Sequence, residues 1–236
     1  MRSDTPTITQ RRQLDDADFF SRISELATNV HEGLGYALAT EVALTKNAKW
    51  TELGTHAVAS ALDWVDGFAK DLAVRSASKA LFKGVKLNNR DTKPNSEQWA
   101  ILHHYGIYDN PRGDEQTDKR YYYSLTGALV VRMARNHDAR SAEQIATNIA
   151  VSKIRDDTKS ELRDYAEQHG WSTNAKALGK LKTFLHGLGI AALLTPTLDN
   201  KAGHMIGTNL ISTGTVVGLL DLQKYRSYIH KQEQKL

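Results

Sequence analysis

The spacing of glycine, proline and polar clusters most limits what this chain can fold into, because it leaves long stretches with apolar residues at helical intervals. Strand signals are scarce, and the one short β-branched run, 213–217, lies inside a longer apolar pattern. We therefore expect an all-α fold. The predicted helical blocks are about 18–44, 50–83, 114–134, 141–170, 174–194, and 203 into the charged tail.

The ends of the chain and one internal segment differ from these blocks. Residues 1–22 lack an apolar core of the signal-peptide kind and are expected to form a polar leader or interfacial segment. Residues 84–113 are polar and contain prolines, which predicts an inserted loop with one short helix around 97–104. The domain is expected to span 23–226, and a charged tail follows at 227–236.

Composition narrows the class of protein. At 236 residues, the chain is long enough for one substantial domain or two small ones. It has no cysteine, which excludes a disulfide framework and a thiolate metal site. Its net charge of +4 at pH 7 fits an anionic substrate, a membrane surface or nucleic acid.

Hydropathy gives no clear membrane span. No run of about 18 or more apolar residues occurs, which is the length that a helix needs to cross a bilayer. The best candidates, 121–134, 184–198 and 205–220, are shorter. Composition alone therefore favours a soluble helical protein.

Two pairs of aspartates are the strongest chemical signal. Asp63 and Asp66 are three residues apart and precede Gly67, and Asp114 and Asp118 are four apart at the start of a predicted helix. These spacings place both members of a pair on one helix face. Four carboxylates converging between two helices repel unless a cation lies between them, and oxygen-only ligation suits Mg²⁺ or Mn²⁺. The structural alternatives are a solvated acidic face and simple charge complementing at a helix N-terminus.

Together the two pairs resemble the signature of the CDP-alcohol phosphatidyltransferases, D-x-x-D-G-x-x-A-R followed by G-x-x-x-D-x-x-x-D. Asp63, Asp66 and Gly67 match the first part, and Asp114 and Asp118 match the end of the second. Members of this family are enzymes of the cell membrane with six transmembrane helices. The resemblance therefore implies a six-helix transmembrane bundle with an amphipathic N-terminal segment, and it suggests a homodimer.

A second resemblance, further along the chain, is to the phosphatidylglycerophosphate synthase branch. That branch carries an Arg-Glu pair, an arginine eight residues on and a G-K-x-K-T motif, which Arg155, Arg163 and 179–183 match in order. Arginine offers phosphate a planar fork, and Lys180 and Lys182 place charge at a helix N-terminus. The alternatives are a salt-bridge face around Arg155 and a cationic surface turn at 179–183.

The resemblance implies transfer of a phosphatidyl group from CDP-diacylglycerol to glycerol 3-phosphate, with release of CMP, in phospholipid biosynthesis. It also implies a role for each matching residue. Mg²⁺ or Mn²⁺ would be held by Asp63, Asp66, Asp114 and Asp118, and Asp118 would also be the general base. The nucleotide would be contacted by Asp63, Gly67 and Lys70. The acceptor phosphate would be bound by Arg155, Arg163, Lys180 and Lys182.

Departures from the family leave other functions open. The family's arginine after Asp66 and Gly67 is missing, and Lys70 is a basic residue close to its position. Charged residues such as Glu32 and Glu41 fall in helical blocks that would have to span the membrane, and each charge costs about 2.5–3.5 kcal/mol at mid-membrane. These features favour an inactive soluble or peripheral helical relative as the alternative. No nucleic acid partner is expected, because no recognisable binding motif occurs. Inositol phosphate or serine are alternative acceptors.

Overall fold

A computed structural model describes residues 7–82, 85, 87, 94–105, 107, 111–171 and 177–235, without the side chains of Ser96 and 111–115. Over these residues the chain is helical and contains no strand, so the predicted all-α fold is confirmed. The chain divides into two compact units. The first unit is Met1–Gly35 with Ala57–Tyr121, and the second unit is Tyr36–His56 with Tyr122–Leu236.

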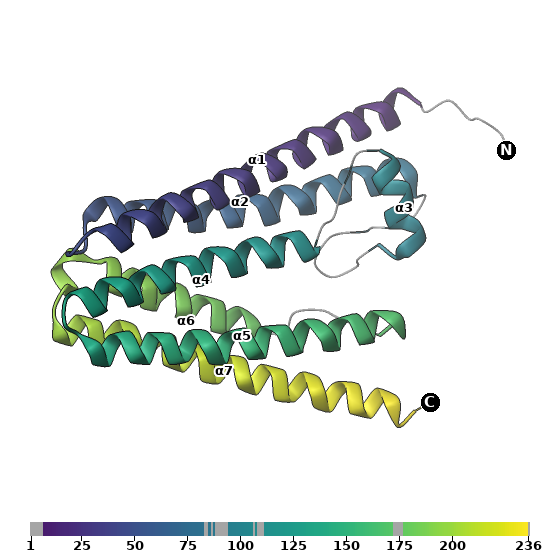
Figure 1. The fold of residues 1–236 in the computed structure, drawn as a ribbon. Helices are drawn as coiled ribbons and strands as arrows, with labels where there is room; N and C mark the ends of the chain where they lie inside the picture. The colour runs from purple at the N-terminus through teal and green to yellow at the C-terminus, as the bar shows by residue number, and fades with distance from the viewer. Residues whose placement is uncertain are drawn as a thin grey trace. The chain divides into compact units, whose positions relative to one another are not determined.

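The described residues form seven α-helices and one 3₁₀ turn, coloured from purple to yellow along the chain in Figure 1. In order, they are α1 (Ile8–Leu44), α2 (Trp50–Leu81), α3 (Ser96–His104), α4 (Pro111–Arg135), α5 (Ala139–Gln168), α6 (Ala177–Leu194), η1 (Pro196–Leu198) and α7 (Lys201–Glu233).

Helix α1 begins ten residues before the predicted block, so most of the predicted leader is helical. The reason is a capping box, in which the Thr7 hydroxyl accepts from the Gln10 amide at 3.2 Å and the Gln10 side chain accepts from the Thr7 amide at 2.8 Å. The predicted short helix is α3, which Asn95 and Gln98 cap in the same reciprocal way. Helix α4 begins at Pro111, three residues earlier than expected, because proline suits the first helical position.

Polar caps also start the helices of the second unit. Asp138 accepts from the amide of Ser141 at the start of α5, and Asn200 accepts from two amides at the start of α7. The break expected at Pro196 is present, since α6 ends at Leu194. The β-branched run 213–217 lies within α7 and is helical, as predicted.

The first unit has an apolar core to which α1, α2 and α3 contribute. Buried residues of this core include Ala17 on α1, Ala73 and Ala77 on α2, and Leu102 on α3. Phe20 and Trp99 pack against them from the edge. Small residues on α1 and α2 let these helices approach closely, as in bundles held together by packing.

In the second unit, α6 packs closely on α7 through glycines. A Cβ on Gly189 would lie 2.8 Å from the carbonyl oxygen of Gly207, and a Cβ on Gly207 would lie 2.6 Å from Leu193. Only glycine fits such a contact, which is the usual basis of close helix packing in membranes. Among the described residues, α6 and α7 are the two helices long and apolar enough to cross a bilayer, whereas the candidate 121–134 in α4 does not reach that level.

Candidate functional site

The first aspartate pair lies on α2, and its two members have different surroundings. Asp66 is 7 % exposed, whereas Asp63 is exposed. The Asp66 carboxylate accepts the hydroxyl of Ser24 on α1 at 2.5 Å and the ammonium of Lys70 at 2.8 Å. Lys70 therefore balances the charge of Asp66 one helical turn away, a pairing that the spacing of four residues allows.

The second aspartate pair lies in the first two turns of α4, in the same unit. Asp118 is exposed there, and the side chain of Asp114 lies outside the described residues. In the described part of the chain, no three His, Asp or Glu side chains come close enough together to hold a metal ion. Among the predicted metal ligands whose side chains the structure describes, Asp66 is buried and has the oxygen chemistry that Mg²⁺ prefers, but these residues do not form a complete ligand set.

Gly67 lies beside the first pair with open space around it. A Cβ at this position would meet no heavy atom within 4 Å in the part of the chain that the structure describes. The backbone of α2 is therefore accessible next to Asp66, as a nucleotide contact at Gly67 would require.

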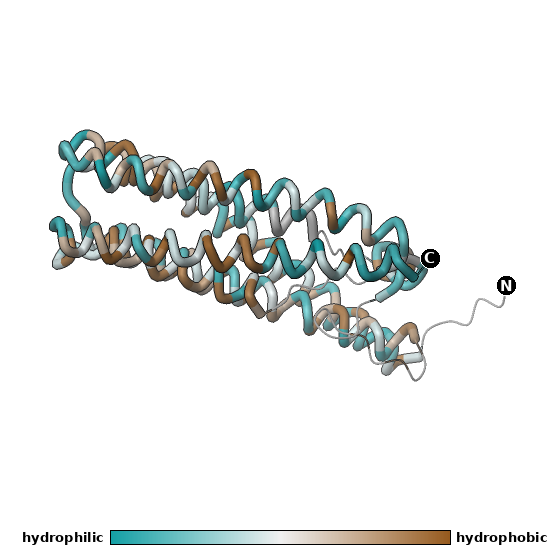
Figure 2. Tube along the Cα trace, turned by 90° about the horizontal axis from the view of Figure 1, so that it is seen from below, coloured by the Kyte–Doolittle hydropathy of each residue, from teal (hydrophilic) through white to brown (hydrophobic). Residues whose placement is uncertain are grey.

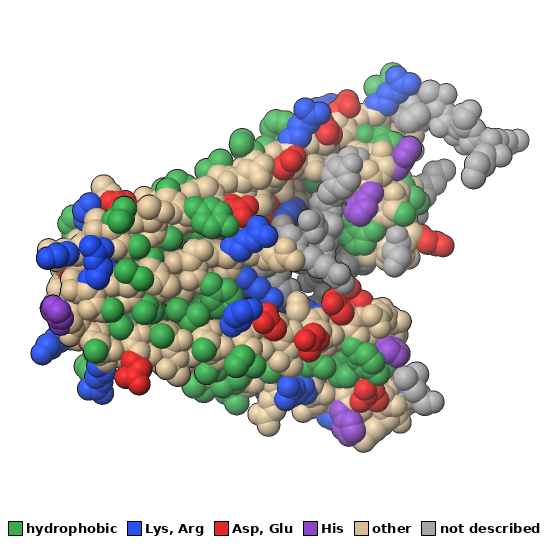
Figure 3. Space-filling model, viewed as in Figure 1, with side chains coloured by type: hydrophobic (Ala, Val, Ile, Leu, Met, Phe, Trp, Pro, Cys, Tyr) green, Lys and Arg blue, Asp and Glu red, His purple; other side chains and the backbone are tan. Residues whose placement is uncertain are grey.

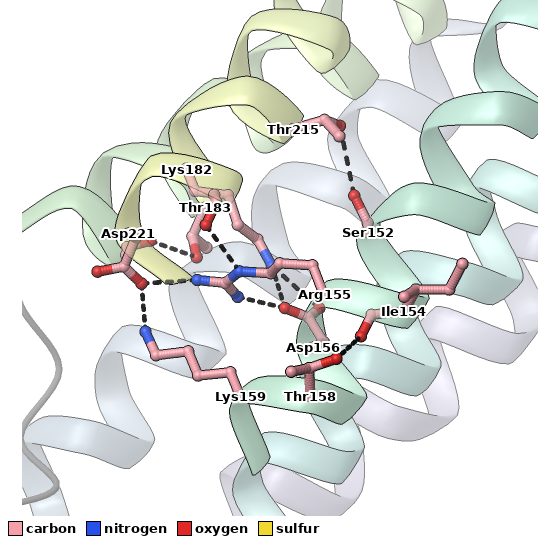
Figure 4. A network of polar contacts seen from close by, with 12 residues as sticks. Ser152, Ile154, Arg155, Asp156, Thr158, Lys159, Lys182, Thr183, Thr215 and Asp221 are labelled. Carbon is pink, nitrogen blue, oxygen red and sulfur yellow. Dashed lines mark hydrogen bonds and ion pairs between the residues drawn. The ribbon is translucent and has the colours of Figure 1, made fainter. Parts of the chain in front are cut away.

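Arg155, Asp156, Lys159, Lys182 and Asp221 form one buried cluster in the second unit, which we call the basic network (Figure 4). Helix α5 contributes three of these residues, α6 contributes Lys182, and α7 contributes Asp221. Because the three helices meet here, residues far apart in the sequence share one site.

Arg155 lies at the centre of the basic network with every guanidinium nitrogen engaged. Its Nε donates to the Gly218 carbonyl at 3.0 Å, its Nη1 donates to Asp156, and its Nη2 donates to Asp221 at 2.6 Å. The three bonds go to three different acceptors, and they use the N–H groups that arginine also offers to phosphate.

Asp156 connects three helices. Its carboxylate accepts from the Lys182 ammonium at 2.9 and 3.0 Å and from the Tyr123 hydroxyl of α4 at 3.0 Å. Arg155 and Lys182, which two separate motifs predicted as phosphate-binding residues, therefore converge on the same carboxylate. The salt-bridge alternative for Arg155 is also present, since Asp156 is its neighbour.

Charge in the basic network does not cancel. Arg155, Lys159 and Lys182 carry three positive charges, and Asp156 and Asp221 carry two negative charges. An excess of positive charge in a buried site is costly without an anion, so the network is suited to bind one.

The other two predicted phosphate-binding residues lie outside this cluster of contacts. Arg163 is half-buried on α5 near Lys159 and Tyr225, close enough to add to the positive potential. Lys180 is exposed in the first turn of α6. Of the four predicted cations, the structure thus brings Arg155 and Lys182 together.

Sequence reasoning missed Lys159 and Asp221. Lys159 lies four residues after Arg155, a spacing that places both on one helix face and was available as a signal. Asp221 is a carboxylate that follows directly on the apolar run of α7, and such groups usually serve a function or have a buried partner. Its partners come from α5, which the sequence did not show.

A second polar cluster lies where the helices of the second unit connect. His204 contacts Asp138 through Nδ1 at 2.8 Å and Asp199 through Nε2 at 3.0 Å, and Asp199 also accepts from the amide of Ala48 at 2.9 Å. Burial alone would raise the pKa of Asp138, but hydrogen bonds from His204 and Ser141 outweigh it and lower the pKa. These contacts hold the segments that connect the helices of the second unit against one another, and we interpret them as structural.

Comparison of the chain with protein-family models, with curated proteins and with solved structures gave no match.

Proposed function

We propose that this chain is a CDP-alcohol phosphatidyltransferase, which transfers a phosphatidyl group from CDP-diacylglycerol to glycerol 3-phosphate and releases CMP. The observation that supports the proposal is the convergence of Arg155 on α5 and Lys182 on α6 at Asp156. Recognition of a phosphate monoester needs fixed cations gathered in one place, and these two come from separate motifs.

The distribution of polar and apolar side chains supports a place in the membrane. Charged groups such as Arg132 and Asp221 are buried, whereas Trp64, Phe184 and Val216 are 82 %, 61 % and 55 % exposed. Figure 2 shows hydrophobic and hydrophilic residues alternating along the helices, and Figure 3 shows hydrophobic side chains at the surface of the viewed face. Buried charges are uncommon unless they are paired, as these are, and large exposed apolar surfaces mark contact with a membrane or with another protein.

Inward-facing charges account for a part of the low hydropathy of the sequence, since Glu52, Arg132 and Asp221 are among the buried charged residues. A charged side chain that points toward other helices lowers the average hydropathy of its own helix without facing lipid. In the proposal, the six spans are α1, α2, α4, α5, α6 and α7, and of these α6 and α7 are long and apolar enough to cross a bilayer by length and composition.

The proposed reaction begins when Asp118 takes the proton from a hydroxyl group of glycerol 3-phosphate. The hydroxyl oxygen then bonds to the phosphorus of the phosphatidyl group, and the bond from that phosphorus to the CMP oxygen breaks. Asp118 is exposed on α4 and so is accessible to a substrate hydroxyl.

The remaining predicted residues bind and orient the two substrates. Asp63, Asp66, Asp114 and Asp118 would hold a divalent ion, which when bound neutralises charge on the departing CMP phosphate. Gly67 gives the nucleotide access to the backbone of α2. Arg155 and Lys182, with Arg163 and Lys180 nearby in sequence, attract the acceptor phosphate.

A second candidate is an inactive helical relative in which the same residues only stabilise the fold. Internal neutralisation favours it, because Lys70 balances Asp66 and the fork of Arg155 is filled by Asp156 and Asp221. Release of the chain from membranes by alkaline carbonate would support this candidate and contradict six spans.

The experiment that tests the enzyme is CMP release by the full chain in detergent micelles with CDP-diacylglycerol. Glycerol 3-phosphate, inositol phosphate and serine are offered as acceptors, with and without Mg²⁺ or Mn²⁺. We expect CMP release that depends on glycerol 3-phosphate and on the ion. No CMP with any acceptor would refute the transferase.

The Asp118→Asn variant tests the general base. We expect CMP release to fall by about 10²–10⁴-fold, the usual contribution of such a base, while binding of the CDP-lipid survives. Asp18→Asn is the matched control, because Asp18 is a partly exposed residue of the same unit paired with Arg22. Undiminished turnover in Asp118→Asn would rule out the assigned role.

A further inference from the structure

Asp221 is the one carboxylate of the basic network that α7 supplies. It is 2 % exposed and accepts from Arg155 Nη2 at 2.6 Å and from Lys159. A Cβ on Gly179 would lie 3.5 Å from Asp221 Oδ2 and 3.8 Å from Lys159 Nζ, so the first turn of α6 passes close to this pair. The predicted phosphate-binding motif of α6 therefore lies next to Asp221 (Figure 4).

A phosphate can bind Arg155 and Lys159 together only at the place that Asp221 holds. The three hydrogen bonds of Arg155 use one N–H group on each nitrogen, out of five on the guanidinium. Asp221 bridges Nη2 of Arg155 and Nζ of Lys159, so a phosphate oxygen that bridges the same two cations takes its place. Asp156 is also held by Lys182 and Tyr123, from two further helices. Asp221 has both of its cations on α5 alone, so it is the carboxylate that can leave with less disturbance.

We propose that Asp221 is a built-in counter-anion, which occupies a phosphate subsite on Arg155 and Lys159 and is displaced by the phosphate group of the acceptor. The identity of the ligand as a phosphate monoester rests on the proposed function. Lys159 becomes a further residue that determines acceptor specificity.

Charge explains why a phosphate monoester displaces Asp221. At neutral pH it carries nearly two negative charges and three acceptor oxygens, against one charge on a carboxylate. With Asp156 in place, two further negative charges balance the three cations of the network. Acceptors with a singly charged or neutral head group are selected against, because they cannot complete this balance.

The test compares thermal unfolding of the full chain in detergent under two conditions, inorganic phosphate and sodium chloride at the same ionic strength. Calorimetry measures the affinity for phosphate in a separate titration. The Asp221→Asn variant keeps the size of the side chain and removes its charge. We expect it to unfold at a lower temperature than wild type in chloride, because buried cations lose a counter-charge. In phosphate it regains stability, and its Kd for phosphate is at least about tenfold lower than that of wild type, since no internal anion competes.

Two further variants keep the test decisive. Asp157→Asn changes an exposed aspartate of α5 that pairs with Lys153, and it should behave as wild type. The double variant Lys159→Gln/Asp221→Asn removes one charge of each sign and should lose the gain in phosphate affinity. Two results would overturn the proposal: an Asp221→Asn protein that binds phosphate no more tightly than wild type, or one whose unfolding temperature phosphate does not raise.

The outcome also separates this inference from the proposed function. Tighter phosphate binding by Asp221→Asn with no CMP release by wild type would refute the transferase and retain the subsite. CMP release that depends on glycerol 3-phosphate, with unchanged phosphate affinity in Asp221→Asn, would refute the subsite and retain the transferase.

Discussion

Two buried arginines of the second unit, Arg132 and Arg155, have opposite surroundings. Arg132 is 0 % exposed and pairs with Glu52, also 0 % exposed, at 2.5 Å, while Thr45 and the Val42 carbonyl accept its other bonds. One cation thus faces one anion. Arg155 belongs to a network in which three cations face two carboxylates.

We propose that this difference separates a structural ion pair from a binding site. A balanced pair such as Arg132–Glu52 has no electrostatic use for a further ion, and it joins α4 to the first turn of α2. A network with excess positive charge is incomplete until an anion arrives. Burial of an arginine therefore says less about function than the balance of charge around it.

The largest effect is expected from breaking the balanced pair. Arg132→Met leaves Glu52 buried without a counter-charge, which should lower the free energy of unfolding by about 3–5 kcal/mol. Chemical unfolding in detergent measures this loss, and phosphate should not restore it. The control is Lys49→Met, which removes an exposed partner of Glu41 and should cost about 1 kcal/mol or less. Equal losses in the two variants would contradict a structural role for Arg132.

A smaller and more specific effect is expected from Arg155→Lys. This variant keeps the charge but loses the planar fork, and hydrogen bonds to charged groups contribute about 1.5–3 kcal/mol. We expect the KM for glycerol 3-phosphate to rise by about 10- to 150-fold, with a smaller change in kcat. Arg140→Lys, an exposed arginine of the same helix, serves as the control. A kcat loss with unchanged KM would place Arg155 outside acceptor binding.

The smallest effect concerns the partly exposed contact between Asp138 and His204. The pKa of Asp138 is lowered in the folded chain, so the unfolded chain binds the proton more readily. The stabilisation is therefore complete above the unfolded pKa of about 4 and is lost as pH falls below it. Between pH 6 and pH 3, the free energy of unfolding should fall less with pH for Asp138→Asn than for wild type, as measured by unfolding curves at each pH. Identical pH dependence in the two proteins would show that Asp138 contributes nothing.

Local features of the fold were predictable from the sequence. Pro196 and the polar caps set helix ends, and the one β-branched run was read as helical because of the longer apolar pattern around it. The early start of α1 was missed because the capping box of Thr7 and Gln10 precedes polar rather than apolar residues. Asp63 and Asp66 share a face only loosely, since a spacing of three leaves them about 60° apart, and this allows one to be buried and the other exposed.

Contacts between distant helices were not predictable in the same way. The motifs at Arg155 and Lys182 marked both residues as phosphate-binding, but nothing in a single sequence places Asp221 of α7 against Arg155 and Lys159 of α5. Helix packing decides that contact, and the register of packing depends on side chains from three helices at once.

We propose that the excess positive charge of the basic network serves recognition of the phosphate on the acceptor. The most direct measurement compares CMP release from CDP-diacylglycerol with glycerol 3-phosphate and with glycerol, which differ only in that phosphate. We predict release with glycerol 3-phosphate that exceeds release with glycerol by at least about 100-fold, equivalent to roughly 2.7 kcal/mol of recognition. Equal release with the two acceptors would contradict the account.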